Sequence, residues 1–188
     1  MSKARLEALS DGAIAITIMV LEMKAPHGTE LSELGPVLPA FLSYVLSFIY
    51  LGIYWTNHHH LVHAARKVDS RVLWANLHLL FWLSLVPFVT AWLGENHGAP
   101  WPTALYGVVL LLAASSFFIL QGLIVADHGP GSALATAVGR DWKGKFSLAA
   151  YAGGIATSFI CPWAADLLYV VVAAVWVVPD RRFAVAHG

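Results

Sequence analysis

Ionisable side chains at the start of the chain are the first candidates for chemistry, because they lie in or beside an apolar run. The segment RLEALSDGAIAITIMVLEMK holds Arg5, Glu7, Asp11 and Glu22. An ionisable group in apolar surroundings is costly, so it normally pairs with a partner or faces a water-filled cavity. Ser10 and Asp11 can also cap the free N–H groups near a helix start. Direct contact with an ion and structural pairing are both open for these residues.

Histidines form the second candidate cluster, in the segment WTNHHHLVHAARK. His59 and His63 have the i, i+4 spacing of two zinc ligands on one helical turn. The segment lacks the glutamate of an HExxH motif, and the basic residues that follow disfavour a divalent cation. We therefore expect no metal, and we predict that these histidines hydrogen-bond to other helices. A pH response is a further hypothesis, because an unperturbed histidine titrates near neutral pH.

Asn76 and His78 are polar positions inside the apolar segment RVLWANLHLLFWLSLVPF. They are expected at a depth similar to that of Ser10, Asp11 and the run His58, His59 and His60. Polar groups on different helices at one depth indicate a single interhelical hydrogen-bond network. We predict that this network fixes how the first three helices meet.

The elements that position these residues are six apolar stretches, in a chain of 188 residues that is 59% hydrophobic and 12% charged. A hydrocarbon core of about 30 Å requires about 20 apolar residues in a helix, and lipid offers no partner for backbone groups outside helices. The sequence therefore predicts an all-α membrane protein, one domain over residues 1–188, with helices near 8–23, 37–55, 72–93, 104–126, 146–162 and 163–178.

The basic residues predict the topology of these six spans. Cytoplasmic loops are enriched in Lys and Arg. With both termini in the cytoplasm, ten of the 11 basic residues lie inside and only Lys24 lies outside. The inner residues are Lys3, Arg5, Arg66, Lys67, Arg71, Arg140, Lys143, Lys145, Arg181 and Arg182.

Composition and missing motifs exclude several functions. The net charge is zero, which argues against nucleic-acid binding. The chain has no GxSxG, GxxxxGK[ST] or GxGxxG motif, so we expect neither enzyme activity nor an organic cofactor. No TVGYG loop is present, so any ion selectivity must come from side chains.

The first helix offers two apolar faces that could form a constriction gating by dewetting. One face holds Ile14, Ile18 and Leu21, and the other holds Ile16, Val20 and Met23. Plain packing on lipid or on a neighbouring helix is the alternative for either face.

The motif RLEALSDG resembles the R-x-x-x-F-S-D signature of the transmembrane-protein-175 potassium channel family, with Leu9 in place of Phe. The segments LSYVLSFIYLGIYWTNHHH, RVLWANLHLLFWLSLVPFVTAWLGEN and VVPDRR are similar to bacterial members. The resemblance implies six helices per subunit, a homotetramer with the first helix around the pore, and conduction that favours potassium, the permeant ion. It also implies a multi-pass protein of a bacterial plasma membrane. The signature network would be Arg5, Ser10, Asp11, His58, His59, Asn76 and His78.

The pore register differs between two ways of matching the family. Matching TIMVLE predicts a constriction of Ile14, Ile18 and Leu21, which we favour from the sequence, whereas counting from the signature predicts Ile16. Two residues rotate a helix by about 200°, so both registers cannot face the pore.

Two rival functions remain. One is a proton-coupled secondary transporter, in which Asp11 and the group His58, His59 and His60 relay protons. The inverted repeat that such a transporter would have is not found in the sequence. The other is a membrane scaffold whose helices associate through small residues such as Gly153 and Gly154.

Overall fold

Every regular element that the structure describes is helical. The computed structural model describes residues 2–21, 29–129, 131–139 and 141–177. Its elements are α1 (Lys3–Met19), the 3₁₀ turn η1 (Leu31–Glu33), α2 (Leu34–Ala64), α3 (Ser70–Ser84), α4 (Val86–Glu95), α5 (Pro100–His128), α6 (Ala133–Val138), α7 (Trp142–Ser158) and α8 (Pro162–Val177). The all-α fold predicted from composition is confirmed.

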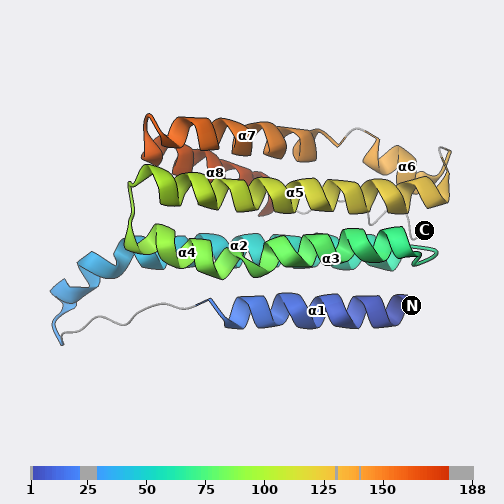
Figure 1. The fold of residues 1–188 in the computed structure, drawn as a ribbon, viewed down its shortest axis with the longest axis horizontal. Helices are drawn as coiled ribbons and strands as arrows, with labels where there is room; N and C mark the ends of the chain where they lie inside the picture. The colour runs from blue at the N-terminus through green and yellow to red at the C-terminus, as the bar shows by residue number, and fades with distance from the viewer. Residues whose placement is uncertain (1, 22–28, 130, 140, 178–188) are drawn as a thin grey trace.

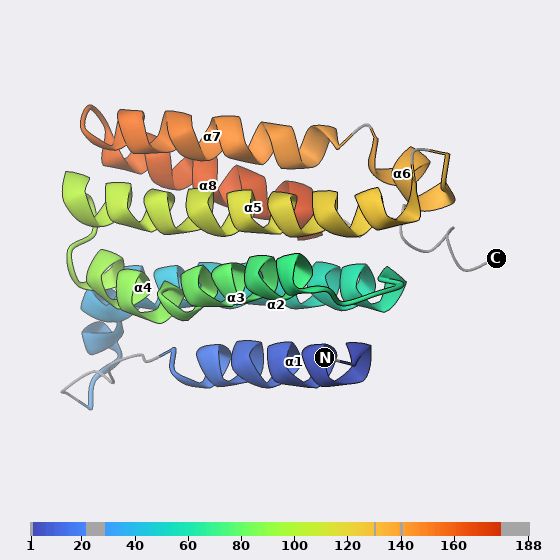
Figure 2. The ribbon, with the colours of Figure 1, turned by 45° about the vertical axis from the view of Figure 1, so that its right-hand side comes forward.

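The long helices lie side by side, with their axes along the longest dimension of the molecule (Figure 1). Helix α1 packs on α2 and α3 along one side of the bundle, while α5 packs on α3, α4 and α7. Helix α8 contacts α7 and α2. The opposite side of α1 carries no other helix in either ribbon view (Figure 2).

Membrane-spanning capacity is clearest for three helical segments. Leu34–Ala64, Ser70–Glu95 and Pro100–His128 are long and apolar enough to cross a bilayer, and Pro162–Val177 is a shorter apolar helix. Helices α1 and α7 have 17 residues each, a length of about 25 Å.

The third predicted stretch is two helices rather than one. Helix α3 ends at Ser84 and α4 begins at Val86, with Leu85 between them. Pro87, at the start of α4, has no N–H to donate and its ring opposes the carbonyl four residues earlier, which interrupts the ladder. Helix α2 continues beyond the predicted end at residue 55 to Ala64, so the segment that holds the histidines is part of the helix.

The described basic residues gather at one end of the bundle. The start of α1, the α2–α3 loop and the start of α7 all lie at that end (Figure 1). They hold Lys3, Arg5, Arg66, Lys67, Arg71, Lys143 and Lys145. Glu22, Met23, Lys24, Arg140, Arg181 and Arg182, which also entered the sequence predictions, lie outside the described residues.

Tyr169 of α8 is enclosed between two glycines. A Cβ on Gly107 would lie 2.1 Å from the Tyr169 hydroxyl oxygen, and one on Gly154 would lie 2.5 Å from Tyr169 Cε1. The Tyr169 side chain is fully buried and donates a hydrogen bond to the Thr103 carbonyl at 3.3 Å. Because neither glycine has a side chain, α5 and α7 can both pack against the Tyr169 ring of α8.

We predict that Gly107→Ala destabilises the protein by about 1–3 kcal/mol, because Tyr169 has no room to move away. Gly122→Ala is the matched control on α5, since a Cβ there meets nothing within 4 Å, and helix propensity alone favours it by up to about 1 kcal/mol. Thermal unfolding in detergent measures both. Equal stability of the two variants would contradict the packing described.

Candidate functional site on the first helix

Ser2 caps the start of helix α1, and one face of the helix packs into the bundle. Ser2 Oγ accepts a hydrogen bond from the Arg5 N–H at 3.4 Å. The residues Leu6, Ser10, Ile14, Thr17 and Leu21, spaced by three or four positions, are buried. This spacing is that of one helical face, so the whole stripe packs against α2 and α3.

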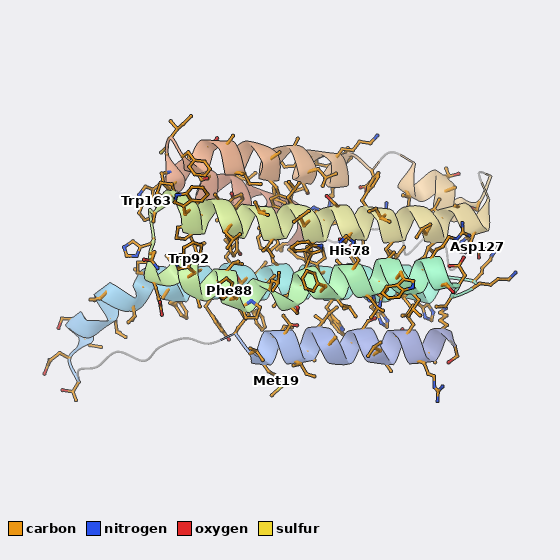
Figure 3. All side chains as sticks on the ribbon, viewed as in Figure 1. Met19, His78, Phe88, Trp92, Asp127 and Trp163 are labelled. Carbon is orange, nitrogen blue, oxygen red and sulfur yellow. The ribbon has the colours of Figure 1, made fainter. Side chains whose placement is uncertain are left out.

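The opposite face of α1 is exposed and apolar along most of its length. Ile16 is 63% exposed, Met19 83% and Val20 54%, whereas Ile14 is fully buried. Figure 3 shows the Met19 side chain pointing away from the bundle. Ile18 packs partly buried against the core, and Leu9 is 48% exposed.

A hydrogen-bonded chain of three fully buried side chains joins α1, α3 and α2. Asn76 Nδ2 donates to Ser10 Oγ at 2.9 Å, and Ser10 Oγ donates to the Leu6 carbonyl at 2.8 Å. His58 Nε2 lies 2.6 Å from Asn76 Oδ1. Because that amide oxygen only accepts, His58 Nε2 carries the hydrogen of this bond. Among the described residues, no hydrogen-bond partner reaches His58 Nδ1.

The start of α3 is fixed independently by Asp69, which positions Asn76. The Asp69 carboxylate accepts from the Val72 N–H at 2.9 Å and from Arg71 Nε at 3.0 Å. The Val72 N–H, with the Arg71 side chain, holds the pKa of the Asp69 carboxyl below its usual range. The cap therefore stays charged at neutral pH.

A second set of contacts runs along α1 and α2 in opposite directions. Trp55 Nε1 donates to Asp11 Oδ1 at 3.1 Å. One turn along, His59 Nδ1 lies 3.2 Å from Glu7 Oε1, within ion-pair distance. A further turn along, Lys3 Nζ donates to the His63 carbonyl. We call these three pairs the α1–α2 ladder.

The single network predicted from the sequence is divided: Asp11 and His59 belong to the α1–α2 ladder, and two further predicted members lie in neither set of contacts. The Arg5 side chain is on the exposed face of α1, about 140° around the helix from Ser10. His78 lies between α3 and α5 (Figure 3), where its Nε2 accepts from Trp82 Nε1 at 2.9 Å and its Nδ1 lies 3.1 Å from Ser116 Oγ. Asn76 and His78 are two residues apart, so they point to nearly opposite sides of α3.

Sequence reasoning did not place Glu7 or Lys3 in the network, whereas the family resemblance also implies Trp partners on the second and third helices, of which Trp55 is one. The signal that could have found the first two is the i, i+4 spacing of Lys3, Glu7 and Asp11, which aligns them on one face.

His59 and His63 stack, with ring centroids 6.2 Å apart. In the described part of the chain, no group of three or more His, Cys, Asp or Glu could hold a metal ion.

We predict that Asn76→Leu lowers stability by about 1–3 kcal/mol, because it leaves the buried His58 Nε2–H without an acceptor. The matched control is Asn96→Leu at the exposed end of α4, where the side chain donates only to the Trp92 carbonyl; because water can replace that bond, the change should cost less than about 1 kcal/mol. Thermal unfolding in detergent compares them. A variant at Asn76 as stable as the control would mean that the chain of hydrogen bonds does not hold α1.

Comparisons with known proteins match potassium channels over the region that contains this site. The family model described as endosomal/lysosomal potassium channel TMEM175 matches residues 5–87, from the start of α1 into α4. A potassium channel from Chryseobacterium sp. (strain P1-3) is 50% identical over 184 residues, which cover 97% of this chain and 96% of that protein. A potassium channel from Streptomyces collinus is 36% identical over 123 residues, 60% of each chain.

The fold has a counterpart among solved structures. The crystal structure of a lysosomal potassium-selective channel TMEM175 homolog from Chamaesiphon minutus matches with a TM-score of 0.81 and 27% identity. The match covers 95% of this chain and 97% of that one. The chain is therefore a multi-pass membrane protein of the TMEM175 potassium channel family, whose members are channels and not enzymes.

Proposed function

We propose that the protein is a passive, potassium-preferring cation channel of a bacterial plasma membrane, formed by four copies of the chain. Residues 1–188 form one domain that spans the membrane six times with both termini in the cytoplasm. The observation that carries the proposal is the division of α1 into a bonded inner stripe and an exposed apolar face. Family membership supports potassium as the permeant ion.

The pore requires several copies, because α1 exposes its apolar face at the edge of a single chain. The buried stripe uses Ser10 for contacts within the subunit. The free face is then available to line an axis shared with other copies. Four copies follow from the family resemblance, and the basic end of each subunit is the cytoplasmic end by the positive-inside rule.

Burial favours Ile16 for the constriction. Ile14 is fully buried and Leu21 is 7% exposed, so neither is free to line an axis outside the subunit. Ile16, followed by Met19 and Val20, lies on the exposed face. We therefore prefer the register counted from RLEALSDG over the one with Ile14, Ile18 and Leu21.

An apolar ring can favour potassium without coordinating it. Ions that pass it lose part of their water, and sodium, which is smaller, holds water more strongly. The selectivity that follows is modest, since no carbonyl cage replaces the lost water.

The geometry does not favour the proton-relay alternative. The hydrogen bonds from His58 through Asn76 and Ser10 end on the Leu6 carbonyl, which has no proton to pass on. The Asp11 carboxylate is bonded to Trp55 and not to the histidines.

The two registers can be separated by matched substitutions in vesicles reconstituted with purified protein. Wild type should carry potassium down its gradient without a proton gradient. We predict that Ile16→Asn raises sodium flux relative to potassium severalfold, because a polar ring lowers the cost of entry for the more strongly hydrated ion.

Ile14→Asn should instead reduce the yield of folded protein, because an amide at this buried position has no partner among apolar neighbours; the cost is about 1–3 kcal/mol. If folded Ile14→Asn protein shows raised sodium flux and Ile16→Asn shows none, the register with Ile14, Ile18 and Leu21 is correct instead. Potassium movement that needs a proton gradient would refute the channel.

A further inference from the structure

Arg5 is the only charged residue on the exposed face of α1, a helix that the structure describes over its whole length. The three other charged residues of this helix belong to the α1–α2 ladder, on a different side; they are Lys3, Glu7 and Asp11. The Arg5 side chain is exposed. Its charge therefore lies on the face that lines the proposed pore.

Arg5 and Ile16 lie on one line along that face. Ile16 follows Arg5 by three turns of helix, so the two directions differ by only about 20° and the two positions lie about 17 Å apart along the axis. Met19, whose side chain points away from the bundle (Figure 3), is within about 40° of the direction of Arg5. Four copies that place Ile16 on a shared axis therefore also place four Arg5 side chains around that axis.

The four Arg5 side chains lie at the cytoplasmic mouth of the proposed pore. The start of α1 lies at the end of the bundle that holds the described basic residues (Figure 1), and the positive-inside rule places that end in the cytoplasm. The distance of about 17 Å to Ile16 is twice the Debye length of about 8 Å in physiological salt. The Arg5 charges therefore act on ions that enter the pore and much less on ions at the constriction.

Carboxylates of the described residues at this end lie on other faces than Arg5. Glu7 is within ion-pair distance of His59 on α2, and Asp69 caps the start of α3. Asp127 lies at the end of α5 (Figure 3), and α3 lies between α5 and α1 in both ribbon views (Figures 1 and 2). A cation that approaches the axis along the start of α1 therefore meets the guanidinium groups first.

We propose that four Arg5 side chains form a ring of positive charge that excludes divalent cations from the cytoplasmic mouth of the pore. Arginine is always protonated, so the ring keeps its charge. The energy of an ion beside the ring is proportional to its valence, so the factor that lowers potassium occupancy is squared for magnesium. Potassium and sodium carry equal charge, which leaves the choice between them to Ile16. The proposal rests on the channel proposed above, with Ile16 on its axis.

The test is the block of potassium current by magnesium in inside-out patches, where the bath reaches the cytoplasmic side. Arg5→Gln should raise potassium current about threefold and the potency of magnesium about tenfold, as expected for four charges about 8 Å from the ion in physiological salt. The preference for potassium over sodium should not change. Arg5→Lys keeps the charge and should behave as wild type. Lys67→Gln is the matched control, because it removes the same charge from the α2–α3 loop at the same end, and it should also behave as wild type.

Equal magnesium block in wild type and Arg5→Gln would overturn the proposal, and so would Arg5→Lys that is as sensitive as Arg5→Gln, since that result assigns Arg5 a structural role. Absence of potassium current in the wild type would instead refute the channel itself, before any variant is compared.

Wild type alone carries the test if Arg5→Gln does not fold. Lowering the ionic strength from about 0.1 M to about 0.01 M lengthens the range of the charges from about 10 Å to about 30 Å. Current that enters from the cytoplasmic side should then fall at least fivefold relative to current that enters from the other side. A ratio of the two currents that does not depend on salt would overturn the proposal.

Discussion

The arrangement of α1 depends on the hydrogen bonds that join three fully buried side chains, Ser10, Asn76 and His58. Their burial keeps water from competing for these bonds. Apolar helix surfaces pack on lipid almost as well as on each other, so apolar contacts alone do not fix the rotation of a helix in a membrane. Asn76 bonds to Ser10 and to His58. Because Ser10 shares a stripe with Ile14 and Thr17, turning Ser10 inward also turns the face of Ile16 outward.

The α1–α2 ladder adds a second constraint, on sliding rather than rotation. The pairs Asp11–Trp55, Glu7–His59 and Lys3–His63 follow each other by one turn on each helix. A slip of one turn, about 5.4 Å, would move Lys3 onto a different partner and would separate Ser10 from Asn76. The two sets of contacts therefore fix both the rotation of α1 and its position along its own axis. A side chain that lines a pore needs both, because it must face the axis at one depth.

The apolar stretches, the all-α fold and the family could be predicted, because composition, length and RLEALSDG carry that information locally. Pairing of Ser10 with Asn76 followed from similar depth alone. The direction of His78 could not be read that way, since depth does not say which side of α3 a residue takes. The choice between Ile14 and Ile16 depends on which face α2 and α3 cover, and that is a property of packing between distant segments. The break at Leu85 had a local signal in Pro87.

The most direct test of the account is the accessibility of single cysteines on α1, in a background where the exposed Cys161 is replaced by Ala. A small cationic thiosulfonate reagent is added to vesicles that carry potassium, and the remaining flux is measured. We predict that Ile16→Cys is modified and loses flux, while Ile14→Cys in folded protein keeps its flux because its thiol is buried. Block at Ile14→Cys without block at Ile16→Cys would contradict the assignment of the two faces.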